Sequence, residues 1–525
     1  MASTRFLQPL TNAPLVRKVA DAVLLRYANH RTTQLDRMDV AAVQRRTLRR
    51  LVQKAKRTKF GRDHDFAGVA SVEDYQARTR VREYEWFWTN YWKDAYPRID
   101  NLTWPGHIPY YALSSGTTSG ATKYIPVSKE MVASNKKAGF TTTALFRHAN
   151  PGAKLFTGKF FFLGGTTDLR RQSDGSHAGD LSGIASRELL ELLRPYTFPP
   201  AELALITNWE EKVQRFAELS AREPVTALSG IPAWMHTLFG RLKQVTGKRT
   251  IAEIWPELRL VIHGGTKFDA YRDLFKQEIG SERVKFCEVY PCSEGFIATE
   301  DPRHGHLRIV PDHGIFFEFV PVEDLGKESP ARHTLANVET GVQYAVVLTT
   351  CAGVWSYMVG DTVAFERRDP PLIRFTGRTK YFLSAFGEHL ISEEIERAVA
   401  HASAVCGVHP LDFHVGPVFS TVPGVAGHHL YLVEFAGGAP ADLPRFAKEI
   451  DGELNRTNED YGPHRVNDLA MRMPEVRVVR RGGFDEWMKA RGKYGGQNKV
   501  PRMDNSGALT KDMLTWFTEH GFVGA

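Results

Sequence analysis

Short apolar runs alternate with amphipathic stretches through the middle of the chain. The apolar runs end in small or polar residues and are typical of strands, whereas several of the stretches between them have the repeat of a helix. The predicted strands cover residues 159–165, 259–265, 284–288, 314–322 and 344–350, and the predicted helices include 209–221 and 232–245. Strands that alternate with helices predict an α/β fold with a partly parallel sheet.

The N-terminal part of the chain has a different pattern. Residues 1–80 are predicted to be mainly helical, and in residues 45–59 apolar positions recur at helical spacing beside a basic face. Residues 83–96 are rich in tryptophan and tyrosine. Such a segment is more often packing than a ligand site, so we assign it no chemistry.

The last part of the chain predicts a smaller unit. Its pattern indicates helices at 392–400 and 441–455 and strands at 429–435 and 476–479. This is a normal composition for an α+β domain of ordinary size. We therefore expect a large N-terminal α/β domain over residues 1–376 and a small C-terminal α+β domain over residues 377–525.

Composition and charge exclude several classes of protein. The 525 residues are 42% hydrophobic and 24% charged, and no apolar run approaches the roughly 20 residues that cross a bilayer. The N-terminus does not have the pattern of a signal peptide, so we expect a cytoplasmic protein without a membrane partner. The net charge of +8 is spread along the chain except in residues 45–59, and we expect no nucleic-acid partner. We also expect a monomer.

Cysteine and histidine offer no metal or disulfide pattern. The four cysteines have no paired spacing, and the 19 histidines do not fall into a ligand motif. Neither a disulfide framework nor a structural metal is predicted.

A dense run of hydroxyls and glycines lies between two strand-like segments, at residues 114–123. Glycine lets backbone N–H groups approach a phosphate closely, and the hydroxyls add further donors. A flexible linker has a similar composition, but a linker is not usually bracketed by strand-like segments. The spacing also differs from that of a Walker A loop. The candidate phosphate ligands are Ser114, Ser115, Gly116, Thr117, Thr118, Gly120 and Lys123.

Three later strand ends carry further candidate chemistry. Ligands collect where the strands of such sheets end. One strand leads to Gly265 and Thr266, another to Tyr290, Ser293 and Glu294, and a third to Asp361. Tyrosine offers a flat face for an adenine ring, and a glutamate can bind Mg²⁺. Asp361, expected in a loop after its strand, could accept hydrogen bonds from both ribose hydroxyls. Each signal alone is also typical of an ordinary turn with a solvated carboxylate.

Taken together, these four motifs resemble those of the adenylate-forming enzymes, and most closely those of the GH3 family of acyl acid amido synthetases. Residues 375–395 resemble the hinge of these enzymes, where a large domain gives way to a small mobile one, with matches at Gly377, Arg378, Gly387 and Glu394. The C-terminal signature Q-x-K-x-P-R is matched by Gln497, Lys499, Pro501 and Arg502. One departure is Met358, which stands where the family commonly has an arginine.

The resemblance implies an ATP-dependent ligase. A carboxylic acid and Mg·ATP would bind between the two domains and react to form an acyl adenylate. The amine of an amino acid would then attack the acyl adenylate, forming an amide and releasing AMP. It implies Lys499 and Glu294 as catalytic residues, the latter also binding Mg²⁺ with ATP. The ATP ligands are the residues named above from the phosphate run and the strand ends, with Arg378. A ligase that forms acyl-CoA thioesters and a non-catalytic nucleotide-binding protein stay open as alternatives, and no residue is identified as the base for amide formation.

Overall fold

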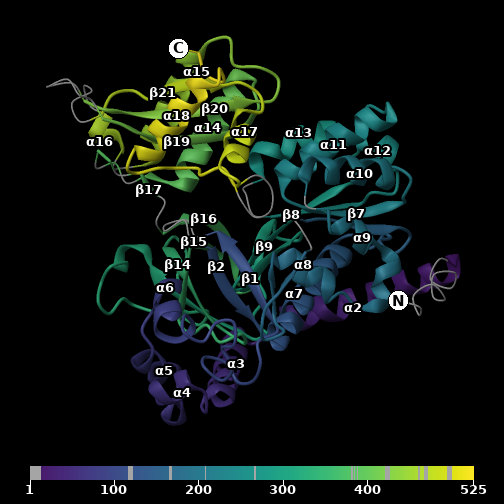
Figure 1. The fold of residues 1–525 in the computed structure, drawn as a ribbon, viewed down its shortest axis with the longest axis vertical. Coiled ribbons are helices and arrows are strands. Elements are labelled where there is room, and N and C mark those ends of the chain that lie inside the picture. The colour runs from purple at the N-terminus through teal and green to yellow at the C-terminus, as the bar shows by residue number, and fades with distance from the viewer. Residues whose placement is uncertain are drawn as a thin grey trace. The chain divides into compact units, whose positions relative to one another are not determined.

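The computed structural model describes residues 13–115, 122–164, 168–206, 208–264, 268–379, 382–383, 385–386, 388, 390–419, 426–458, 461–465, 471–493 and 499–524. The chain divides into two compact units (Figure 1). The first comprises Met1–Phe268, Phe275–Val359 and Val363–Arg374, and the second Asp269–Leu274, Gly360–Thr362 and Phe375–Ala525. Among the described residues, no helix combines the length and the apolar character needed to cross a membrane.

A twelve-stranded sheet runs through the first unit in the order β13-β12-β14-β15-β16-β11-β10-β9-β8-β7-β3-β6. The strands β6, β3, β7, β8 and β9 are parallel, which confirms the predicted partly parallel sheet. The bounds are β3 Lys159–Leu163, β6 Thr197–Phe198, β7 Val225–Gly230, β8 Leu260–Gly264, β9 Lys285–Cys292, β10 Gly295–Asp301, β11 His306–Ile309, β12 Ile315–Pro321, β13 His333–Thr334, β14 Gln343–Thr350, β15 Tyr357–Arg367 and β16 Leu372–Arg378.

Helices cover both faces of the parallel strands (Figure 1). Successive side chains of a strand point to opposite faces, so β3 can contact both layers. Phe161 of β3 packs on Phe216 of α10 and on Trp255. On the other face, Leu24 of α2 and Phe146 of α7 share a buried cluster with residues of β7 and β8. The helix bounds in this part of the chain are α2 Pro14–Asp36, α7 Lys129–Ala149, α8 Leu181–Arg187, η3 Glu191–Tyr196, α9 Ala201–Ala204, α10 Trp209–Ser220, α11 Pro232–Thr246, α12 Ile251–Ile254 and α13 Asp269–Ile279.

A second sheet of the first unit has the order β2-β1-β5-β4. Its strands are β1 Tyr110–Ser115, β2 Thr122–Val127, β4 Arg170–Arg171 and β5 His177–Gly179. The first two form an antiparallel hairpin whose register runs from the pair Tyr110 and Val127 to the pair Ser115 and Thr122. The two apolar segments predicted on either side of the hydroxyl-rich run are therefore strands.

The described residues of the N-terminal part are mainly helical, as predicted. Its elements after α2 are α3 Val40–Ala55, α4 Lys59–Asp63, η1 Phe66–Gly68, α5 Val72–Arg78, α6 Tyr84–Phe87 and η2 Trp88–Trp92. The Ser71 side chain caps α5 in a capping box with Asp74. The aromatic segment that follows packs internally, with Phe87 stacked on Trp92 and tilted against Tyr357.

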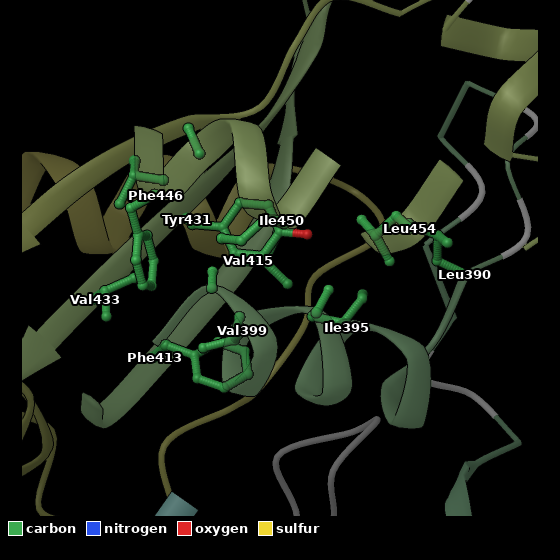
Figure 2. Close-up of a cluster of buried hydrophobic side chains, with 14 of the residues drawn as sticks. Leu390, Ile395, Val399, Phe413, Val415, Tyr431, Val433, Phe446, Ile450 and Leu454 are labelled. Atoms are coloured by element: carbon green, nitrogen blue, oxygen red, sulfur yellow. The ribbon is translucent and has the colours of Figure 1, made fainter. Parts of the chain in front are cut away.

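The second unit has a three-stranded sheet of its own, in the order β19-β20-β21. Figure 2 shows how side chains of α14 and α15 pack against this sheet: Ile395 and Val399 come from α14, and Phe446 and Ile450 from α15. The bounds are β17 Phe382–Leu383, β18 Leu390–Ile391, α14 Ser392–Cys406, β19 Pro410–Val418, β20 His428–Phe435, α15 Leu443–Thr457, α16 Tyr461–Arg465, β21 Glu475–Val479, α17 Gly483–Ala490 and α18 Ala508–Glu519. The mixed α/β fold with a smaller C-terminal part agrees with the sequence prediction.

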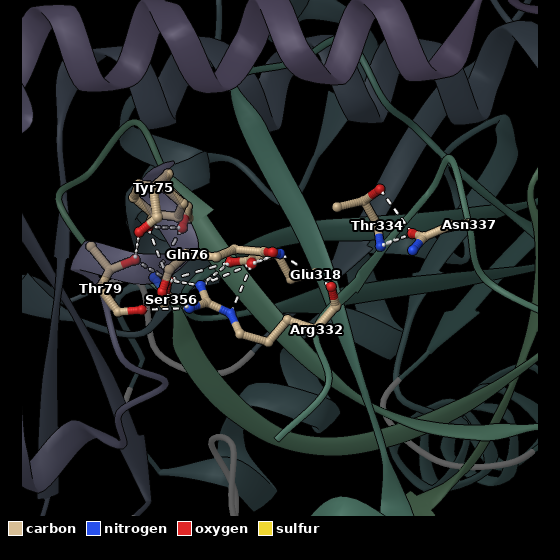
Figure 3. A network of polar contacts seen from close by, with 9 residues as sticks. Tyr75, Gln76, Thr79, Glu318, Arg332, Thr334, Asn337 and Ser356 are labelled. Carbon is tan, nitrogen blue, oxygen red and sulfur yellow. Dashed lines mark hydrogen bonds and ion pairs between the residues drawn. The ribbon is translucent and has the colours of Figure 1, made fainter. Parts of the chain in front are cut away.

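A polar network around a buried ion pair joins the N-terminal helical part to the large sheet. Arg332 and Glu318 lie 2.8 Å apart, with 8% and 0% of their side chains exposed. Arg332 also donates a 2.6 Å hydrogen bond to the Ser356 hydroxyl, which in turn lies 3.0 Å from the Tyr75 hydroxyl of α5 (Figure 3). Ser356 has a left-handed φ of 44° and directly precedes β15. The network therefore fixes where β15 begins.

We predict that Glu318→Gln lowers the free energy of unfolding of the first unit by about 3 kcal/mol, because it leaves the Arg332 guanidinium buried without a counter-charge. Urea unfolding followed by circular dichroism measures this. The matched control is Glu328→Gln, whose ion pair with Arg80 is largely exposed and which should leave the midpoint unchanged. Equal shifts for both variants would contradict the importance of the buried pair.

Candidate functional site

The hydroxyl-rich run connects the two strands of the β1–β2 hairpin. Ser114 lies in β1 opposite Lys123 of β2, and Ser115 is the last residue of β1. The predicted phosphate ligands Gly116, Thr117, Thr118 and Gly120 lie outside the described residues. The described part of the hairpin thus places both ends of the predicted loop at one edge of the small sheet.

Lys123 is the charged member of this hairpin. Its ammonium lies 3.7 Å from the Glu85 carboxylate and 5.3 Å from the centre of the Tyr84 ring, and 20% of its side chain is exposed. The Tyr84 hydroxyl also accepts a hydrogen bond from the backbone N–H of Tyr124. An anion at Lys123 would therefore share the ammonium with Glu85.

Ser293 and Glu294 form the two-residue turn between β9 and β10. The flanking residues Cys292 and Gly295 are paired, and the Cys292 thiol donates to the Gly295 carbonyl over 3.0 Å. A Cβ on Gly295 would lie 2.5 Å from a side-chain carbon of Ile315, so glycine lets the turn sit close to β12. Tyr290 is buried within β9, which runs four residues further than the sequence pattern predicted. Gly265 and Thr266 lie outside the described residues.

The turn brings Glu294 to the first residue of β15. The Tyr357 hydroxyl forms a hydrogen bond with the Glu294 carboxylate, and the pKa of Tyr357 is raised well above 10, first by burial and then by this carboxylate. Backbone hydrogen bonds with Arg82 hold both neighbours of Tyr357, at 3.0 Å for Ser356 and 2.8 Å for Met358. Two of the predicted motifs, far apart in sequence, therefore meet at this hydrogen bond. Tyr357 was not singled out from the sequence, although it begins the motif that contains Asp361.

Glu294 is a buried carboxylate without a basic partner in the described part of the chain. Only 8% of the residue is exposed. Burying an ionised carboxylate is costly unless a cation or hydrogen-bond donors compensate, and Tyr357 supplies one donor. A divalent cation that binds one or two carboxylates together with substrate phosphates suits such a residue. Glu294 is therefore a fitting candidate ligand for Mg²⁺.

Asp361 lies within β15, and the expectation of a loop at this position was wrong. Gly360, with φ of +90°, interrupts the strand only locally, and apolar positions at Val363 and Phe365 continue it. The Asp361 carboxylate lies 2.9 Å from Nε of Arg378 at the end of β16. Two residues predicted to bind ATP are thus brought together.

Lys499 belongs to the same compact unit as Asp361 and Arg378. Lys499 is exposed to solvent. The protein packed around its ammonium lowers the pKa of Lys499 to about 8, whereas the charge of the Asp361 carboxylate raises it. A lysine with this pKa is still mostly an ammonium at neutral pH. The Lys499 ammonium, the Asp361 carboxylate and the Arg378 guanidinium together suit a ligand that carries both hydroxyls and phosphates.

Comparison with known structures shows which fold the chain shares. The AtGH3.15 acyl acid amido synthetase in complex with 2,4-DB has the same fold, with a TM-score of 0.78 and 18% identity over 95% of this chain and 96% of that one. The shared fold has a large N-terminal and a smaller C-terminal domain. The chain belongs to the GH3 family: it matches the GH3 family N-terminal domain over residues 30–214 and 169–284, the central domain over 308–378 and the C-terminal domain over 393–508.

Curated relatives are amido synthetases. Indole-3-acetic acid-amido synthetase GH3.8 of Oryza sativa subsp. indica is 32% identical over 236 residues, which are 41% of this chain and 38% of that protein. Indole-3-acetic acid-amido synthetase GH3.4 of Arabidopsis thaliana is 23% identical over 536 aligned residues, covering 88% of this chain and 89% of that protein. The family models confirm the family that the sequence predicted, and the names of these relatives agree with the predicted enzyme class, acid–amino acid ligase.

We predict that Asp361→Asn weakens ATP binding by about tenfold or more, because hydrogen bonds to a charged acceptor contribute about 1.5–3 kcal/mol. Isothermal calorimetry measures the affinity. Glu366→Gln is a matched control, since Glu366 is on the same strand and forms a 2.5 Å ion pair with Arg374 of β16. An unchanged affinity for the Asp361 variant would remove its assignment to ATP.

Proposed function

We propose that this protein activates a small carboxylic acid with ATP as an acyl adenylate and transfers the acyl group to the amine of an amino acid, releasing AMP and pyrophosphate. The observation that carries the proposal is the match of all three GH3 domains in order along the chain. The buried Glu294 and the Asp361–Arg378 pair support it chemically, since they are suited to a metal-bound phosphate and a ribose. We further propose that the enzyme is a cytoplasmic monomer without nucleic-acid or membrane partners.

The first half-reaction is a substitution at the α-phosphorus of ATP. A carboxylate oxygen of the acid forms the new bond and pyrophosphate leaves. We assign the Ser/Thr/Gly run, including Ser114 and Ser115, to the phosphates, Tyr290 to the adenine and Asp361 to the ribose. Mg²⁺, held by Glu294, would neutralise charge on the phosphates. The ammonium of Lys499 would stabilise the charge that builds on the acid and the α-phosphate.

In the second half-reaction the neutral amine of the amino acid attacks the acyl carbonyl. The C–N bond forms, the bond to the AMP oxygen breaks, and the amine gives up a proton. The names of the relatives suggest indole-3-acetic acid as one acid to test.

The test is a panel of carboxylic acids crossed with amino acids, incubated with Mg·ATP. We expect pyrophosphate release that depends on the acid, and mass spectrometry should detect an N-acyl amino acid. A thioester formed only with coenzyme A would instead support the ligase alternative. Nucleotide binding without acid-dependent pyrophosphate release would support the non-catalytic alternative.

The proposed role of Lys499 predicts a dependence on pH. Because the ammonium is the active form and the pKa of Lys499 is lowered to about 8, the rate of adenylation should fall as the pH rises through about 8. In Lys499→Arg the guanidinium stays charged, so the variant should be slower but should lose this alkaline decline. Acid-dependent pyrophosphate exchange measured between pH 6 and about 10 checks both. An identical decline in the variant would show that another group titrates.

A further inference from the structure

The segment that follows Lys499 is attached to β19 by an isolated β-bridge. The backbone N–H of Val415 donates to the carbonyl of Arg502 over 3.0 Å, and the N–H of Asp504 donates to the carbonyl of Val415 over 2.9 Å. Val415 and Met503 form a parallel bridge. The backbone is thus fixed to the sheet of the second unit three residues after Lys499.

The Arg502 side chain adds a second attachment. Its Nη1 donates to Oδ1 of Asp412 over 2.6 Å and to the carbonyl of Phe413 over 2.8 Å, and its guanidinium lies 4.2 Å from the centre of the Phe413 ring. Glu396 of α14 approaches Nε at 3.9 Å. Burial raises the pKa of Asp412, and Arg502 counters this by favouring its ionised form. Arg502 therefore ties the segment to β19 and α14 at once.

His414 fixes the residue just before Arg502. Its Nδ1 lies 2.7 Å from the carbonyl of Pro501, and its Nε2 lies 2.8 Å from the hydroxyl of Thr510. Burial lowers the pKa of His414 to about 4, so the ring is neutral. A neutral ring that donates from Nδ1 to the carbonyl accepts at Nε2 from the hydroxyl. Both ring nitrogens are satisfied, and Pro501 is held two residues after Lys499.

A lysine ammonium is a compact charge on a flexible stem, so its backbone must be held for the charge to reach one place repeatedly. We propose that Arg502, through Asp412, is a positioning residue for Lys499: the Arg502–Asp412 contact fixes the segment from which the Lys499 side chain extends. Arg502 itself contacts no reacting atom in this assignment. The inference rests on the proposed function, because it needs Lys499 to act in adenylation.

The test is a double-mutant cycle on acid-dependent pyrophosphate exchange. Arg502→Leu keeps apolar contact with Phe413 but loses Asp412, and it should lower kcat at least tenfold while KM for ATP changes less than about twofold. In a Lys499→Ala background the same substitution should change the remaining rate less than about twofold. Equal fold losses in both backgrounds would overturn the assignment, since they would show that Arg502 acts independently of Lys499.

Arg465 provides a matched control in the same unit. It lies 2.6 Å from Asp451 and donates to the carbonyl of Met471 over 2.6 Å, so its contacts are of the same kind. Arg465→Leu should lower the melting temperature and leave kcat for exchange within twofold of the wild type. A tenfold loss of kcat in this control would assign the effect of Arg502→Leu to general destabilisation and overturn the proposal.

A second variant covers the case in which Arg502→Leu does not fold. Asp412→Asn preserves the shape of the side chain and weakens only the charge of its contact with Arg502. We expect a smaller loss of kcat that again disappears in the Lys499→Ala background. No loss of kcat in Asp412→Asn would overturn the role of this contact. If the wild type shows no acid-dependent exchange with any acid of the panel, the proposed function fails first, and this assignment falls with it.

Discussion

The start of strand β15 depends on one buried ion pair. Arg332 and Glu318 are withdrawn from water, and this is tolerable only because hydroxyls and carbonyls around them satisfy the remaining hydrogen bonds. Ser356 is part of that set and adopts a left-handed backbone conformation there. Since Tyr357 follows at once, the same network determines where its hydroxyl meets Glu294. A buried polar network that includes Ser356 thus sets the geometry of the candidate metal site.

Glu294 and Asp361 differ in how the charge of the carboxylate is compensated. Glu294 is buried with a phenol donor and, among the described residues, without a cation of its own, which leaves it suited to an added one. Asp361 already has a protein cation in Arg378. A carboxylate with a fixed counter-charge is held in one orientation, as binding two ribose hydroxyls would require. The difference matches the different roles proposed for them.

Lys499 differs from both carboxylates because its side chain is exposed. The attachment of its segment lies just downstream, in Pro501 and Arg502. A lysine that acts in only one step needs a mobile side chain, but its backbone must be held in place so that the ammonium returns to the same position. In the proposed roles, the C-terminal signature combines the acting residue, Lys499, with two residues that hold its segment, Pro501 and Arg502.

The sequence by itself determined the α/β class, most of the strand and helix positions, and the motifs that identify the family. These are local properties, because apolar periodicity and turn chemistry depend on residues near one another in the chain. Only the tertiary structure decided that Asp361 lies within a strand, since a Gly-Asp pair is typical of a turn until neighbouring strands pair with it on both sides. Likewise Tyr357, Asp412 and His414 gave no signal of their own. Their roles come from partners dozens of residues away, and one sequence does not show which distant side chains will meet.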